Sequence, residues 1–135
     1  MSANERAAEA AMALVGVPFR LHGRDCRRGL DCVGVAVAAL GGEARLGPVM
    51  TGYALRSGDG VGAQAALRRA GLEPVDVPRI GDVILAQAGP GQLHLAVLVT
   101  GGIVHADAVL RKVVFRPGGP PWPVASAWRF YNEEK

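Results

Sequence analysis

Two apolar patterns in the N-terminal half of the chain predict helices. Ser2-Ala3-Asn4-Glu5 is a capping box, and the alanine-rich run after it predicts a helix to Val15. The longest apolar run, Val33 to Leu40, is ambiguous, because its valines favour a strand and its alanines favour a buried helix. We choose a helix for this run, since Asp31 can cap its start and Gly41 can end it.

The second half of the chain has a β-type pattern. A glycine-rich stretch from Leu46 to Val61 predicts a long loop and a candidate rim of a cleft, and Gly62 to Ala70 predicts a short helix. Alternating apolar residues between turn signals then predict six strands, over Val75–Val77, Asp82–Gln87, Leu93–Val99, Ile103–Asp107, Lys112–Arg116 and Ala125–Tyr131. Helices followed by an antiparallel β-meander are typical of the α+β class, and we expect one domain over residues 1–135.

Composition narrows the classes of function. The chain has 135 residues, a formal net charge of +3 and only 5% aromatic residues, so it lacks the dense basic and aromatic face of a nucleic-acid-binding protein. No stretch reaches the ~18 apolar residues of a membrane span, and the N-terminus lacks the basic and apolar regions of a secretory signal. We therefore expect a protein that is cytoplasmic as synthesised, with reduced thiols at Cys26 and Cys32.

The stretch Gly29-Leu30-Asp31-Cys32-Val33-Gly34 is the strongest candidate for chemistry. If Asp31 caps a helix, Cys32 lies in its first turn, where free N–H groups and the helix dipole favour thiolate over thiol. Cys32 is then a candidate nucleophile. Two alternatives stay open, namely that Cys32 is a buried core residue, or that it binds a metal ion together with His22 and Cys26.

A thiol nucleophile needs a base, and two histidines lie on successive predicted strands. We interpret His94 as the base that takes and returns the proton of Cys32, and His105 as the group that orients the His94 ring. Backbone N–H groups at the helix start, including that of Cys32, would face the oxyanion. His22 lies in a polar loop and is most simply a solvated residue. No cofactor or metal ion enters this scheme.

The motifs around these residues are similar to those of a known family. Gly16-Val17-Pro18-Phe19-Arg20 followed by Gly29-Leu30-Asp31-Cys32-Val33-Gly34 resembles the NlpC-type cell-wall cysteine peptidases, papain-like enzymes of bacteria and phages. Ile80-Gly81-Asp82-Val83-Ile84-Leu85 resembles the Gly-Asp-Val turn of that family. His94-Leu95-Ala96-Val97-Leu98 resembles its catalytic histidine strand, and Val104-His105-Ala106 the strand of its third polar group. The resemblance implies a papain-like α+β fold and cleavage of peptidoglycan stem peptides, typically beside a γ-linked D-glutamate.

Two positions depart from the family pattern. The family usually has a tyrosine where Phe19 stands and a serine where Val33 stands, and these groups, with the aspartate at Asp31, help to hold the free amine of the substrate. Phe19, Asp31 and Val33 are therefore the candidate substrate-binding residues. Because only Asp31 keeps its polar group, we expect a more apolar pocket that is less demanding of a free amine.

The strand register predicted from the turn conflicts with this catalytic scheme. A two-residue Gly101-Gly102 turn pairs Leu98 with His105 and leaves His94 four positions further along, roughly 13 Å away at ~3.3 Å per residue. A hydrogen bond needs about 3 Å. The scheme thus requires a bulge, strong coiling or a different turn.

Three functions compete on these grounds. The leading one is a cysteine peptidase of cell-wall peptides, the second is an amidase or acyltransferase that uses Cys32 and His94, and the third is a non-catalytic module such as a phage-tail component. Because we expect no export signal, a wall hydrolase would travel in a phage tail or gene-transfer-agent particle, leave by lysis, or act inside on recycled wall peptides.

Overall fold

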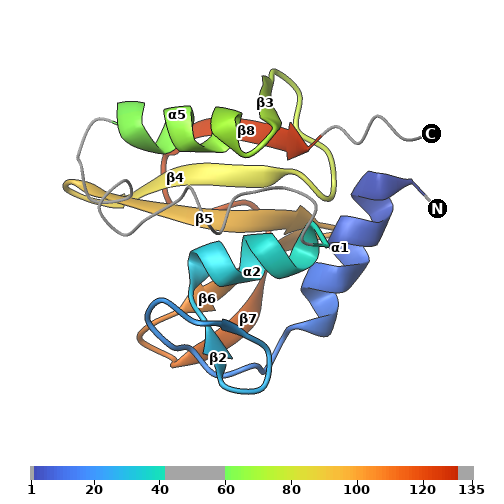
Figure 1. Cartoon of the computed structure of the whole chain (residues 1–135), viewed down its shortest axis with the longest axis vertical. Helices are drawn as coiled ribbons and strands as arrows, with labels where there is room; N and C mark the ends of the chain where they lie inside the picture. Colours follow the sequence, from blue (N-terminus) through green and yellow to red (C-terminus); the bar gives the residue numbers. More distant parts are fainter. Residues whose placement is uncertain (1, 42–59, 131–135) are drawn as a thin grey trace.

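The computed structural model describes residues 2–41 and 60–130, and Figure 1 shows how their elements are arranged. A sheet of six antiparallel strands has the order β3-β8-β4-β5-β6-β7. Helices α1 and α2 pack against each other and against β5, and α5 packs against β3. This is an α+β fold with the helices first and the sheet after, as the sequence predicts.

The helices begin at the caps that the sequence indicates. Helix α1 spans Ala3–Ala13, and the capping box between Ser2 and Glu5 is formed at its start. Helix α2 spans Cys32–Ala39 and is capped by Asp31, so the helical interpretation of the apolar run is confirmed. Helix α5 spans Val61–Arg69, close to the predicted bounds. Most of the predicted loop from Leu46 to Val61 lies outside the described residues.

The strands follow the predicted order with small shifts in their ends. Strands β4 to β7 form the meander, and the chain then returns so that β8 lies between β3 and β4. The edge strand predicted at Val75–Val77 is there, but its bounds are wrong: the residues that pair with β8 are Leu72–Val75, and residues 76 and 77 form a bend. The six strands of the sheet span Leu72–Val75 (β3), Val83–Gly89 (β4), Gln92–Val99 (β5), Gly102–Asp107 (β6), Lys112–Pro117 (β7) and Val124–Phe130 (β8).

A small hairpin stands where the sequence suggests only a loop. Strands β1, Arg24–Asp25, and β2, Gly29–Leu30, pair with each other directly before α2. The hairpin packs tightly on the helix: a side chain at Gly34 would collide with the carbonyl oxygen of Gly23. Glycine at position 34 is therefore required for the hairpin to approach the start of α2.

The two faces of the sheet bury different side chains. On β5, Leu93, Leu95 and Val97 join the clusters that contain residues of the helices. Ala96 and Leu98 belong to a separate cluster that includes Trp122 and no helical residue. Because side chains alternate along a strand, His94 shares the face of Ala96 and Leu98.

The register of β5 and β6 differs from the predicted one. The pairs are Val97 with Val104, Leu98 with Ile103, and Val99 with Gly102, so the turn is Thr100-Gly101 and not Gly101-Gly102. Gly102 belongs to β6, where an added side chain would collide with the carbonyl oxygen of Arg116 on β7. Gly102 thus allows β6 and β7 to approach each other closely. The changed register of β5 and β6 also brings His94 two residues closer to His105 than the predicted register does.

A buried ion pair joins three distant segments at the start of β4. The carboxylate of Asp82, which is 0% exposed, accepts bonds of 2.8 Å from Nε and Nη2 of Arg129 on β8. It also accepts bonds from the Asn4 side chain of α1 at 2.9 Å and the Arg79 backbone at 2.8 Å. The Gly-Asp-Val motif therefore ties the first helix to the sheet.

Replacing Asp82 by alanine is expected to lower the free energy of unfolding by about 3–5 kcal/mol, because a buried guanidinium loses its bidentate partner. Urea unfolding of the variant and the parent measures this loss. Arg28→Ala is the control, since the ion pair of Arg28 with Asp25 is long, 3.9 Å, and exposed, and its loss should change stability by less than about 0.5 kcal/mol. Equal effects of the two substitutions would contradict the role given to Asp82.

Within residues 2–41 and 60–130, no helix has the length and apolar character needed to span a membrane.

Candidate active site

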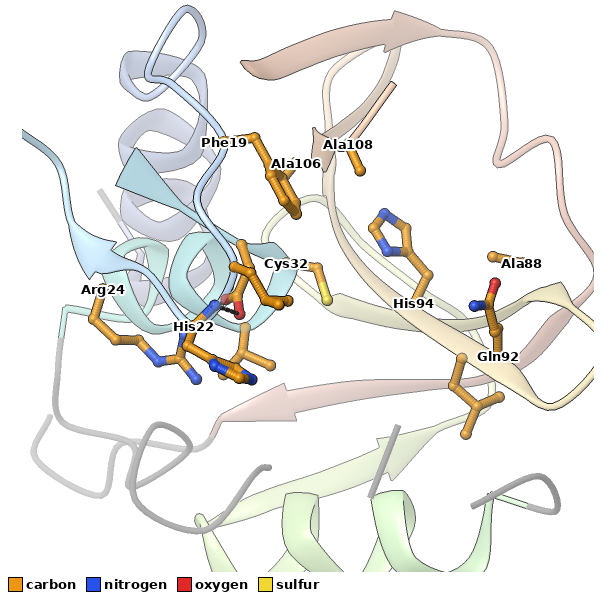
Figure 2. Close-up of a pocket in the computed structure, with 13 residues that line it drawn as sticks. Phe19, His22, Arg24, Cys32, Ala88, Gln92, His94, Ala106 and Ala108 are labelled. Atoms are coloured by element: carbon orange, nitrogen blue, oxygen red, sulfur yellow. Dashed lines mark hydrogen bonds and ion pairs between the residues drawn. The ribbon is translucent and has the colours of Figure 1, made fainter. Parts of the chain in front are cut away.

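A cavity of about 230 Å³ opens at the N-terminal end of α2. The start of α2 lines it together with three other segments: the loop and hairpin before α2, the end of β4 with the start of β5, and the end of β6 with the residues just after it. Figure 2 shows Cys32 and His94 on opposite walls of this space. The cavity brings together Cys32, His94 and the three predicted substrate-binding residues, which are Phe19, Asp31 and Val33.

Cys32 occupies the first position of α2 and is 9% exposed. Oδ1 of Asp31 caps the helix by accepting the N–H of Gly34 at 2.9 Å. The N–H of Cys32 has no acceptor within the helix, as at any first helical position. The thiol and this donor therefore lie together at the positive end of a capped helix.

Burial decides the ionisation state of this thiol. It raises the pKa of Cys32 to about 11, and the Asp31 carboxylate acts in the same direction. Backbone bonds from Leu95 and Val33 and the charge of Arg24 oppose the shift without reversing it. The lowered pKa predicted from the helix start is wrong for the resting site, where Cys32 is a neutral thiol.

The two strand histidines are in direct contact. Nε2 of His94 lies 3.1 Å from Nδ1 of His105, a hydrogen-bond distance. His94 lines the main cavity, whereas His105 is 4% exposed and lies behind it. The contact uses Nε2 of His94 and leaves its Nδ1 for another partner, which is the geometry a base needs when a second group orients its ring.

Trp122 is a site residue that the sequence reasoning missed. Its ring makes edge contacts with both imidazoles, at centroid distances of 5.0 Å to His94 and 5.1 Å to His105. It comes from the proline-rich loop between β7 and β8, which the sequence indicates only as a rigid connection. A tryptophan between prolines is a signal for a fixed aromatic group, but only the fold shows what it covers.

Burial also keeps the imidazoles neutral. It lowers the pKa of His94 to about 4, and the neighbouring His105 adds to this effect. Burial lowers the pKa of His105 as well, against the opposing charge of Asp107. At neutral pH the resting site therefore holds a thiol and two uncharged imidazoles, so His94 is available to accept a proton.

Acidification is expected to destabilise the fold through His94. The pKa of His94 is 6.5 for a solvated histidine, as in the unfolded chain, and about 4 in the fold. Between these pH values the unfolded chain binds more protons than the folded one, so the free energy of unfolding falls as the pH drops through them. The difference corresponds to about 3 kcal/mol. Urea unfolding at pH 7.5 and at pH 4 measures this loss.

His94→Gln is the control for that prediction, because glutamine does not titrate. The variant should lose distinctly less stability than the parent between the two pH values, with any remainder arising from His105 and the carboxylates. A parent and variant with the same pH dependence would contradict the assignment to His94.

The other candidate residues of the sequence analysis are Phe19 and Val33, proposed to bind substrate, and His22 and Cys26, proposed as metal ligands with Cys32. Phe19 is half-buried on the cavity wall, and Val33 is only 2% exposed, with most of its side chain in the core. His22 lines the cavity, whereas Cys26 is exposed and does not. In the part of the chain that the structure describes, no group of three His, Cys, Asp or Glu side chains could hold a metal ion, so His22, Cys26 and Cys32 do not form one.

No family model matches the sequence, and no curated protein matches it. Solved structures do match the fold. NlpC1 from Trichomonas vaginalis has a TM-score of 0.66 at 20% identity, over 93% of this chain and 44% of its own. The NlpC/p60 domain of the peptidoglycan hydrolase SagA has a TM-score of 0.58 at 23% identity, over 94% of this chain and 98% of its own. Rv1477, described as a hypothetical invasion protein of Mycobacterium tuberculosis, has a TM-score of 0.61 at 22% identity, over 95% of this chain and 62% of its own.

These likenesses define the class of fold. The chain has the fold of NlpC/p60 domains, as the resemblance in its sequence implied. It spans less than half of the length of NlpC1 and about the whole of the SagA domain.

Proposed function

We propose that this protein is a cysteine peptidase that hydrolyses peptidoglycan stem peptides, at the bond beside a γ-linked D-glutamate. The observation that carries the proposal is that a capped cysteine, Cys32, and a histidine, His94, line one cavity, with the His94 ring in contact with His105. The fold adds support, since one structure that shares it is the NlpC/p60 domain of a peptidoglycan hydrolase.

In this mechanism Cys32 is the nucleophile and His94 is the base. Sγ attacks the carbonyl carbon as its proton moves to Nδ1 of His94, and the electron pair of the carbonyl bond moves onto oxygen. Backbone N–H groups at the start of α2 stabilise that oxyanion. The tetrahedral intermediate collapses, the C–N bond breaks, and His94 gives its proton to the leaving nitrogen. Water, deprotonated by His94, then hydrolyses the thioester and restores the thiol.

His105 acts through His94. For Nδ1 of His94 to accept a proton, its Nε2 must carry the other hydrogen and donate to Nδ1 of His105 across their 3.1 Å contact. His105 thereby fixes both the tautomer and the ring plane. Trp122 packs edge-on against both imidazoles and so helps to hold the two rings in place.

The test is incubation of the protein with purified cell-wall fragments, followed by mass analysis of the products. Cleavage on the carboxyl side of D-glutamate supports the proposal. Release at another amide, or transfer of an acyl group to an added amine, would favour the amidase or acyltransferase alternative, and unchanged fragments would favour the non-catalytic module. Carriage in a phage-tail or gene-transfer-agent particle stays a prediction.

A further inference from the structure

Asp31 is already occupied in the free protein. Its Oδ1 accepts the helix-capping N–H of Gly34 at 2.9 Å and Nη1 of Arg24 at 2.7 Å, and its Oδ2 accepts the N–H of His22 at 2.9 Å. His22 has a φ of +63°, a left-handed conformation that is uncommon for a residue other than glycine and that accompanies the bond of its N–H to Asp31. Of about four acceptor positions on a carboxylate, three are filled.

Arg24 also neutralises the charge of Asp31. Nη1 bridges Asp31 and the carbonyl oxygen of Gly23, at 2.7 Å and 3.0 Å, which fixes the guanidinium at the cavity wall. Its side chain is 33% exposed, against 11% for Asp31, and both residues line the cavity, so the cation is the more accessible member of the pair. Among the described residues that line the cavity, Arg24 and Asp31 are the only Lys, Arg, Asp or Glu side chains, and their charges cancel.

A cationic amine is poorly matched to such a wall. An ammonium group needs acceptors and a negative field, but at this wall it would meet a guanidinium, a carboxylate that is already paired, and the ring of Phe19. A neutral acyl group fits better, because its carbonyl oxygen can accept from the guanidinium nitrogens that Asp31 does not use.

We propose that Arg24 is a specificity-determining residue that makes this cavity accept stem peptides whose N-terminal nitrogen is acylated, as in peptides still linked to sugar, in preference to peptides with a free ammonium. The inference rests on the proposed function for the class of ligand. It differs from the expectation based on Phe19 and Val33, since it assigns the preference to a charged residue that can be changed alone.

Binding to the Cys32→Ala variant tests the inference without turnover. Calorimetry compares a synthetic stem peptide with a free amine and the same peptide N-acetylated. With Arg24 intact, we expect the acetylated peptide to bind at least as tightly as the free amine. In Cys32→Ala/Arg24→Gln, the uncovered Asp31 should shift the ratio toward the free amine by roughly tenfold, about 1.4 kcal/mol.

Two control variants separate position from charge. Arg24→Lys keeps a cation beside Asp31 and should keep the parent ratio. Arg27→Gln, in the same hairpin but outside the cavity lining, removes the same net charge and should not move it. If Arg24→Gln fails to fold, as judged by thermal melting, the ratio measured with Arg24 intact still decides the matter.

Three results would overturn the inference: tighter binding of the free amine than of the acetylated peptide with Arg24 intact, an unchanged ratio in Arg24→Gln, or no binding of either peptide. The proposed function is judged separately. It fails if the parent protein binds these peptides but leaves cell-wall fragments uncut, whatever their order of affinity.

Discussion

Replacing Cys32 by alanine is expected to reduce hydrolysis of a stem peptide by at least about 10⁴-fold, with the fold retained. The sulfur is the nucleophile in the proposed mechanism, and no other sulfur lines the described part of the cavity. Removing it from a residue that is 9% exposed leaves a small gap that should cost about 1 kcal/mol or less. Initial rates by product chromatography, together with a thermal melt of each protein, measure both quantities.

Cys26→Ala is the matched control for that experiment. Cys26 carries the same group, but it is exposed in the hairpin before α2 and does not line the cavity. Its loss should leave the rate within about twofold of the parent. Activity above roughly one per cent of the parent in Cys32→Ala, or a large loss in Cys26→Ala, would show that the nucleophile has been assigned wrongly.

The local structure around Cys32 could be predicted because its signals are local. Capping of α2 by Asp31 depends on residues within one turn of each other, and the capping box of α1 is equally compact. The α+β class follows from the change in periodicity along the chain. Resemblance in the motifs then pointed to the fold that the solved structures share.

The register of β5 and β6 could not be predicted in the same way. A pair of glycines between two strands is a turn signal, but Gly102 is a glycine because the Arg116 carbonyl of β7 lies against it. That strand is more than ten residues away in sequence. The register that allows His94 to contact His105 therefore depends on the packing of β6 against β7. With that register, the distance that the predicted turn placed between the two histidines is no longer an obstacle.

The ionisation state of the site is likewise a tertiary property. The helix start favours a thiolate locally, but the surrounding core buries Cys32 and raises its pKa to about 11. The pair between Arg24 and Asp31 joins a hairpin to a helix, and Trp122 reaches the histidines from a loop. None of these contacts has a periodic signature in the sequence.

His94→Ala is expected to lower the rate of hydrolysis by about 10³-fold or more, because proton transfer is lost in both halves of the reaction. His105→Ala should cost at least tenfold less than that. Without His105 the ring of His94 still reaches the cavity, but it spends part of its time in the tautomer with Nδ1 protonated, which cannot act as the base. Values of kcat and KM for both variants measure the difference, and kcat should carry most of it.

His105→Asn separates a positioning role from a merely structural one. An asparagine oxygen can take the place of Nδ1 of His105 as the acceptor of the Nε2 hydrogen of His94, so this variant should recover part of the rate lost in His105→Ala without a matching gain in melting temperature. A kinetically silent His105→Ala would show that another group orients His94. Gln92, which lines the cavity, would then be the first candidate. Asp107 would be the second, because its Oδ1 already accepts the N–H groups of Val109 and Leu110 at 2.9 Å and is committed to its own turn.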